Sequence, residues 1–157
     1  MASLVLFVCT GNTCRSPMAE ALLRAALPEA SPWRAASAGL AAGEGARASE
    51  FAVAALSELG CDLRGHASRP AAAEHVREAD VIVAMTEDHA RQLAERFPDA
   101  RDRIHLLRSF DPDSPAHSDV SDPFCGGLDD YRRSRDLIRR AIPGLVRFLE
   151  QTASAAH

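Results

Sequence analysis

Near its start the chain carries a short apolar run at residues 4–8, and after Cys9 a Thr-Gly-Asn turn follows. Five consecutive apolar residues bounded by turn-forming residues are typical of a parallel β-strand that is buried on both faces. The run at 81–85 has the same character, and the segments 35–39 and 104–107 are also predicted as strands. Strands of this kind need helices over both faces of their sheet, and this requirement constrains the fold more than any other feature of the sequence.

Segments with apolar residues at helical spacing separate these runs. They predict helices at 17–27, 49–59, 70–79, 86–97 and 128–152. We expect Pro143 and Gly144 to kink or split the last helix. We also expect residues 108–127, which are rich in proline, aspartate and glycine, to form a long exposed loop. Strands that alternate with helices form right-handed βαβ units. The predicted fold is therefore an α/β three-layer sandwich, a four-stranded parallel sheet with helices on both faces.

A length of 157 residues suits one domain, which we place at 1–152, with 153–157 as a frayed C-terminal tail. The 18 basic and 22 acidic residues give a formal net charge of -4, which argues against nucleic acid or a membrane surface as the main partner. All 18 basic residues are arginine, which excludes a lysine Schiff base.

The early apolar run is too short to cross a membrane and lacks the features of a signal peptide. We therefore expect a cytoplasmic protein that is monomeric by default.

The four cysteines, Cys9, Cys14, Cys61 and Cys125, are too few and too scattered for a disulfide framework. Cys9 and Cys14 are not followed by a second pair of cysteines or histidines at the spacing of a zinc site. We therefore expect reduced thiols, and neither a metal nor a cofactor. The question is then whether one of these thiols is reactive.

The segment Cys-Thr-Gly-Asn-Thr-Cys-Arg-Ser-Pro at 9–17 leaves a predicted strand and enters a predicted helix. In such a turn the backbone N–H groups converge on an anion, and they favour the thiolate form of a cysteine that opens the loop. Arg15 closes the loop six residues after Cys9, and its planar guanidinium can bind two phosphoryl oxygens. Ser16 can donate a hydrogen bond to the thiolate. In this setting C-x5-R-S predicts the phosphate-binding loop of a cysteine phosphatase, against the alternative of an inert buried thiol.

The predicted phosphate-binding residues are Thr10, Gly11, Asn12, Thr13, Cys14, Arg15 and Ser16. Gly11 and Asn12 tolerate the positive φ that a tightly curled loop requires. Catalysis also needs an acid for the leaving group and then a base for water, and one aspartate can fill both roles. The segment 108–127 offers four aspartates, and the residues alone do not choose among Asp111, Asp113, Asp119 and Asp122.

The stretch CTGNTCRSPMAE at 9–20 resembles the low-molecular-weight protein tyrosine phosphatase family. The resemblance covers nearly the whole chain, through Ser37-Ala38-Gly39, His66, residues 79–85 and Asp122-Pro123-Phe124 in the expected order. It implies the same four-stranded parallel sheet that the strand pattern predicts.

The resemblance also implies the roles of the site residues. Cys9 is expected as the nucleophile, Arg15 as the phosphate ligand, and Asp122 as the general acid because Asp-Pro supplies it in the family. Asn12, Ser37 and His66 are expected to form a hydrogen-bonded network that holds the loop. For Cys14 two interpretations stay open: a reversible disulfide with Cys9, or a small packed side chain.

Thr13 bears on the substrate. Members that resemble the tyrosine-specific branch usually carry a larger aliphatic residue there, commonly isoleucine, whereas threonine resembles the protein-arginine-phosphatase branch. A short polar side chain can admit and orient a planar guanidinium. Phe124 is followed by Cys125 and two glycines, and this pattern also resembles the protein-arginine-phosphatase branch. By itself the Phe124 ring does not discriminate, because it can stack on a guanidinium or on a phenol. The resemblance favours phosphoarginine in proteins, with phosphotyrosine as the alternative and a phosphocysteine intermediate in either case.

Two other functions are less favoured. A thioredoxin-coupled arsenate reductase shares the fold and the C-x5-R loop, but it needs two further cysteines on a mobile segment. The chain has no cysteine between Gly65 and Phe124. A non-catalytic phosphate-binding module would not need a nucleophile and an acid together. A phosphatase acting on a phosphorylated protein is the function we expect.

Overall fold

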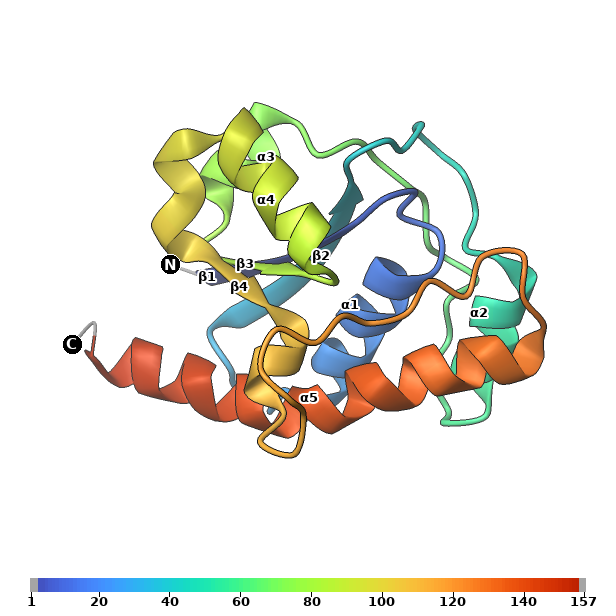
Figure 1. The fold of residues 1–157 in the computed structure, drawn as a ribbon. Helices are drawn as coiled ribbons and strands as arrows, with labels where there is room; N and C mark the ends of the chain where they lie inside the picture. The colour runs from blue at the N-terminus through green and yellow to red at the C-terminus, as the bar shows by residue number, and fades with distance from the viewer. Residues whose placement is uncertain (1–2, 156–157) are drawn as a thin grey trace.

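A four-stranded parallel sheet lies between two layers of helices in the computed structural model, which describes residues 3–155 (Figure 1). The strands lie in the order β2-β1-β3-β4, and every neighbouring pair is parallel. Their bounds are β1 Ser3–Cys9, β2 Trp33–Gly39, β3 Val81–Ala84 and β4 Ile104–Leu106. The predicted α/β three-layer fold is confirmed.

The central strand β1 is buried on both faces, as its unbroken apolar run predicts. Val5 and Phe7 belong to the larger core on one face of the sheet, whereas Leu6 and Val8 belong to the smaller core on the other. Successive side chains of a strand point to opposite faces, so one run of five residues supplies both cores. The strand therefore fixes Cys9, its last residue, at the carboxyl edge of the sheet.

Helices cover both faces of the sheet (Figure 1). One layer holds α1 Arg15–Ala26, α2 Glu50–Ser57 and α5 Leu128–Ala155, and the other holds α3 Ala73–Glu78 and α4 Glu87–Arg96. The 3-10 helices η1 Pro98–Arg103 and η2 Leu107–Phe110 flank β4. None of the helices within residues 3–155 is both long and apolar enough to cross a membrane.

The helix predicted at 70–79 is shorter in the structure, because the chain before Ala73 is held by the end of β2. Gly39 donates its N–H to the Arg69 carbonyl and accepts the N–H of Ala71, and Pro70 forms an isolated bridge with Gly39. Backbone groups used in this way cannot join a helix, so α3 begins only at Ala73. The first helix begins earlier than predicted, at Arg15 rather than at Pro17.

The predicted split at Pro143-Gly144 is wrong, since α5 is one continuous helix. Pro143 removes one helical hydrogen bond, but Leu145 and Leu149 in the next turns are fully buried and hold the helix in the core. Gly144 has a packing role, because a Cβ at this position would overlap the carbonyl oxygen of Phe110. The helix also continues to Ala155, three residues into the expected tail, whereas 156–157 lie outside the described residues.

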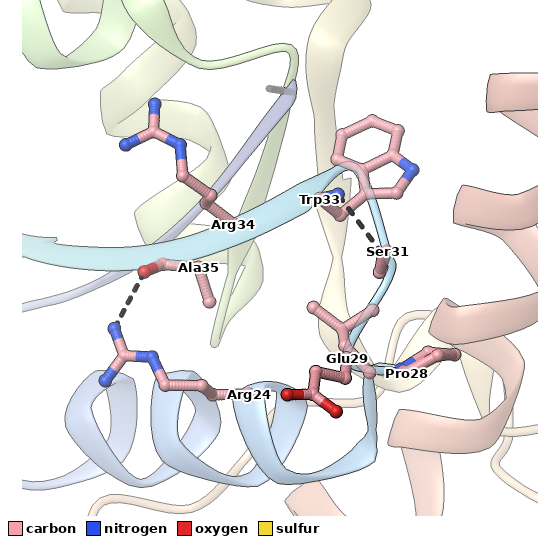
Figure 2. A pocket seen from close by; sticks show the side chains of 8 residues that line it. Arg24, Pro28, Glu29, Ser31, Trp33, Arg34 and Ala35 are labelled. Carbon is pink, nitrogen blue, oxygen red and sulfur yellow. Dashed lines mark hydrogen bonds between the residues drawn. The ribbon is translucent and has the colours of Figure 1, made fainter. Parts of the chain in front are cut away.

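Arginine side chains cover backbone groups along the outer edge of β2. Arg24 donates from Nη2 to the carbonyl of Ala35 at 3.0 Å, as Figure 2 shows. Arg69 donates from Nε to the carbonyl of Ser37, also at 3.0 Å. Two carbonyls that would otherwise be open to solvent at this edge are therefore occupied by side chains from the helix and loop beside it.

Candidate active site

The loop from β1 to α1 surrounds a cavity of about 180 Å³. Segments more than 100 positions apart line it, because the predicted phosphate-binding loop meets the chain that precedes α5. The lining residues are Cys9, Thr10, Gly11, Thr13, Cys14, Arg15, Asp122 and Phe124. The structure thus brings together the predicted nucleophile, the arginine, the acid and both predicted specificity residues.

Cys9 lies at the base of this site and is 3 % exposed. Its Sγ is 2.8 Å from the hydroxyl oxygen of Ser16 and accepts the backbone N–H of Asn12 at 3.3 Å. Both contacts fix the position of the sulfur at the base of the cavity. The sulfur is therefore held where a thiolate is needed for attack.

Arg15 is a buried cation at the first position of α1, with 5 % exposure. Its Nη1 donates to the carbonyl of Val120 at 3.1 Å, and its Nη2 is 3.5 Å from Oδ2 of Asp122. Its Nε has no hydrogen-bond partner among residues 3–155. A buried charge with an unused N–H favours an anion in the adjoining cavity.

Asp122 is the one of the four candidate aspartates that lines the cavity. Asp111 instead accepts hydrogen bonds within its own turn, including that of Ser114 at 2.9 Å. Asp119 accepts the backbone N–H of Glu87 at 2.8 Å, at the start of α4. Of the four, Asp122 is therefore the one that lies where a group bound in the cavity could reach it.

The chain just before Asp122 is anchored at three points. Val120 donates its N–H to the carbonyl of Met85 at 2.9 Å and accepts Arg15. Ser134 of α5 donates its hydroxyl to the carbonyl of Ser121 at 2.8 Å. These contacts tie the segment to the end of β3, to the phosphate-binding loop and to α5, so the position of Asp122 is set by the core of the fold.

Asn12 holds the curl of the loop. Its φ of 57° lies in the left-handed region, which asparagine tolerates better than most residues. Its Nδ2 donates to the hydroxyls of Ser16 and Ser37, both at 2.9 Å. The Nε2 of His66 is 2.7 Å from its carbonyl oxygen. Asn12, Ser37 and His66 thus form the contacts that the resemblance implied.

Gly39 allows the loop to lie close to the end of β2. A Cβ at this position would be 2.5 Å from the carbonyl oxygen of Thr10 and 3.0 Å from the backbone nitrogen of Asn12. Both neighbours are backbone atoms of the phosphate-binding loop, so a side chain here would displace the loop itself.

Cys14 lies on the side of the loop that faces α2 and α5. Its Sγ is 3.4 Å from the hydroxyl of Tyr131 and 3.6 Å from that of Ser49. Burial and the contact with Cys14 raise the pKa of Tyr131 to about 12. Cys9 and Cys14 are both free thiols, and a reversible disulfide between them stays a prediction.

The geometry agrees with a comparison against known families. The model of the family described as low molecular weight phosphotyrosine protein phosphatase matches residues 4–155. The chain belongs to this family. It is therefore a phosphatase, with the fold that its sequence predicted.

Relatives of this phosphatase include enzymes named for two different substrates. A protein-arginine-phosphatase of Geobacillus stearothermophilus is 42% identical over 93% of this chain and 95% of its own length. A low molecular weight protein-tyrosine-phosphatase of Streptomyces coelicolor is 38% identical over 90% of each chain. A solved arginine phosphatase mutant with a phosphorylated active site serine superposes with a TM-score of 0.86, at 38% identity, over 94% of this chain and 95% of the other.

Two further residues of the phosphatase extend the network around Asn12, and sequence reasoning missed both. Glu20 accepts the hydroxyl of Ser37 at 2.6 Å, and the backbone N–H of Arg69 donates to Oδ1 of Asn12 at 3.0 Å. Glu20 follows Ser16 by four positions, which places both on one face of α1 and could have indicated the contact. Arg69 gives no such signal, because its role depends on how the loop before α3 crosses the sheet edge.

Within residues 3–155 no group of three or more histidine, cysteine or acidic side chains is arranged to hold a metal ion.

Proposed function

We propose that this phosphatase removes the phosphoryl group from phosphoarginine in proteins, through a phosphocysteine intermediate. The observation that carries the substrate assignment is Thr13, a short polar residue in the cavity wall. Members that resemble the tyrosine-specific branch usually carry a larger aliphatic residue at this position. The 42% identity to a protein-arginine-phosphatase supports the same assignment.

The first step is attack of the Cys9 thiolate on phosphorus. A sulfur–phosphorus bond forms while the phosphorus–nitrogen bond to the guanidine breaks. Asp122 donates its proton to the departing nitrogen, since guanidine is too basic to leave as an anion. Arg15 and the N–H groups of the loop stabilise the charge on the three phosphoryl oxygens as it develops.

The second step is hydrolysis of the phosphocysteine. Asp122, now ionised, takes a proton from water, and the water oxygen attacks phosphorus. The sulfur–phosphorus bond breaks, inorganic phosphate leaves, and Ser16 stabilises the returning thiolate through its hydroxyl 2.8 Å from the sulfur. One carboxyl group thus serves both steps and ends as it began, protonated.

Thr13 and Phe124 form the walls against which the leaving group lies. The backbone of Thr13 is fixed by α2, because Ser49 at the start of that helix donates its N–H to the Thr13 carbonyl at 2.9 Å. Phe124 is 70% exposed at the rim, where its ring is free to stack on a planar group. A planar cationic guanidinium fits between a polar side chain and an aromatic face.

Phosphotyrosine is the second candidate substrate. The ring of Phe124 can also stack on a phenol, and the Streptomyces relative is named for tyrosine. The mechanism would be unchanged, with a phosphorus–oxygen bond broken in the first step.

Phosphate release from matched peptides that carry either phosphoarginine or phosphotyrosine tests the proposal, at neutral pH and with Cys9→Ser as the blank. Two variants separate size from polarity at the wall. Thr13→Ile adds bulk and removes the hydroxyl, whereas Thr13→Val removes the hydroxyl alone.

We expect the unsubstituted enzyme to prefer phosphoarginine and Thr13→Ile to shift the preference toward phosphotyrosine. A shift of equal size in Thr13→Val would assign the effect to the hydroxyl, and a smaller one to bulk. Equal or better activity of the unsubstituted enzyme on phosphotyrosine would overturn the substrate assignment, and activity on neither peptide would favour a phosphate-binding module.

The proposal extends to the setting of the enzyme. We place it in the cytoplasm, as a monomer that acts on phosphorylated proteins. Its four free thiols agree with a reducing compartment. Sedimentation at micromolar concentration tests the monomer, and a mass of twice 16.8 kDa would contradict it.

A further inference from the structure

A buried histidine on α4 contacts the phosphate-binding loop from outside the cavity. His89 lies in the first turn of α4, where its backbone N–H donates to the Thr86 hydroxyl at 3.1 Å. Its side chain is 4 % exposed. It reaches the loop because α4 begins directly after β3, whose carboxyl end lies beside that of β1.

The partner of His89 in the loop is the residue that follows the nucleophile. Its Nε2 is 2.9 Å from the hydroxyl oxygen of Thr10, and Thr10 lines the cavity. The backbone of Thr10 is fixed separately, since its carbonyl accepts the N–H of Ala41 at 2.9 Å. The hydroxyl is thus the part of Thr10 whose direction His89 controls.

The surroundings of His89 keep its imidazole neutral. The charged groups around it are Arg15 from α1, Asp88 from its own helix, and Asp119 and Asp122 from the segment after η2. Burial and the charge of Arg15 outweigh the three carboxylates and lower the pKa of His89 to about 4. A neutral imidazole has a single N–H, so the tautomer decides what Thr10 can do.

The contacts of the second ring nitrogen indicate which tautomer is present. Nδ1 is buried and has no hydrogen-bond partner within residues 3–155. Buried N–H groups without an acceptor are rarer in proteins than under-used acceptors. The proton therefore belongs on Nε2, which donates to Thr10, and the Thr10 hydroxyl must direct its own hydrogen elsewhere.

We propose that His89 is a positioning residue, which turns the Thr10 hydroxyl so that its hydrogen points into the cavity and is donated to a phosphoryl oxygen. This role rests on the phosphate-binding function proposed for the loop. With the opposite arrangement, Thr10 would donate to His89 and present a lone pair to the anion, which would repel it.

The test compares variants at both ends of the contact. His89→Gln places an amide N–H near the position of Nε2, whereas His89→Asn has the same polarity but is too short to reach Thr10. Thr10→Val removes the hydroxyl at nearly constant volume. The measurements are kcat and KM for p-nitrophenyl phosphate and the inhibition constant of inorganic phosphate, with thermal melts to verify folding.

We expect His89→Asn and Thr10→Val each to raise the inhibition constant of phosphate about tenfold, the size of one hydrogen bond to an anion. His89→Gln should stay within about threefold of the unsubstituted enzyme. Since both residues act through one hydroxyl, the double variant His89→Asn/Thr10→Val should be no worse than Thr10→Val alone.

Equal inhibition constants in His89→Gln and His89→Asn would overturn the proposal, because a purely structural role does not depend on reach to Thr10. Effects that multiply in the double variant would overturn it as well. If the unsubstituted protein neither hydrolyses p-nitrophenyl phosphate nor binds phosphate, the proposed function of the loop fails first, and this role falls with it.

Discussion

Oδ2 of Asp122 lies 3.5 Å from Nη2 of Arg15, a separation too long for a tight ion pair. The two groups differ in setting, because the Arg15 side chain is 6% exposed and that of Asp122 is 55% exposed. Oδ1 of Asp122 meanwhile accepts the N–H of Phe124 at 3.0 Å. The carboxyl group thus lines the cavity while its side chain stays open to solvent.

Asp122→Asn should slow the first chemical step by about a hundredfold or more, the usual contribution of a general acid. The loss should be greatest for leaving groups that depart as poor anions, and smallest for p-nitrophenol. Single-turnover rates on p-nitrophenyl and phenyl phosphate measure this. Asp113→Asn, an exposed aspartate of the same segment, is the matched control and should behave as the unsubstituted enzyme. A loss independent of the leaving group would show that Asp122 does not act as the acid.

Cys9→Ser should abolish turnover while phosphate binding survives, because Arg15 and the loop N–H groups are unchanged. Titration with inorganic phosphate by calorimetry measures the binding, and phosphate release measures the turnover. EDTA should leave the unsubstituted enzyme active, since every group in the proposed steps belongs to the protein or to water. Measurable steady-state turnover by Cys9→Ser would contradict the phosphocysteine mechanism.

Gly39→Ala should damage the active site although Gly39 does not line the cavity. Its Cβ would be 2.5 Å from the backbone oxygen of Thr10, so the loop must move. A shift of this kind commonly costs about a hundredfold in kcat/KM, and about 1–3 kcal/mol in the free energy of unfolding. Gly43→Ala is the control, since no atom lies within 4 Å of the Cβ position there. Equal kinetics for the two variants would contradict the close approach.

Acid should destabilise the fold partly through His89. The pKa of His89 is 6.5 in the unfolded chain and about 4 in the fold. Between these values the unfolded chain binds a proton that the folded chain does not, so the free energy of unfolding falls as the pH is lowered. The contribution is about 2 kcal/mol between pH 7 and pH 5. Urea unfolding at both pH values measures this contribution. Between pH 7 and pH 5 the free energy of unfolding of His89→Gln should fall by about 2 kcal/mol less than that of the unsubstituted protein. An identical pH dependence in the variant would contradict a buried neutral imidazole.

The local sequence pattern was enough to predict the strands and to single out Cys9 and Arg15. The apolar run before Cys9 and the spacing from Cys9 to Arg15 lie within one stretch of chain, so the sequence contains both. The approach of Asp122 to Arg15 depends on where the segment after η2 crosses the cavity. Before the structure, only the family resemblance selected Asp122 among the four aspartates. Contacts such as His89 with Thr10 had no sequence signal, because they join two strand ends whose neighbourhood appears only when the sheet forms.

The continuity of α5 shows the opposite error. Pro143 has a strong local preference against a helix interior, and that preference predicted a break. The local cost is outweighed by the burial of one helix face in the core, where Leu145 and Leu149 have no exposed surface. Local propensity is a weak guide wherever a long amphipathic element is fixed by tertiary packing.

The arginines along β2 have a consequence for how a target protein can be held. An extended polypeptide binds many domains by adding itself to a free sheet edge as one more strand. At β2 such an addition would have to displace Arg24 from Ala35 and Arg69 from Ser37. Addition of a target's main chain at this edge is therefore opposed by two side-chain contacts.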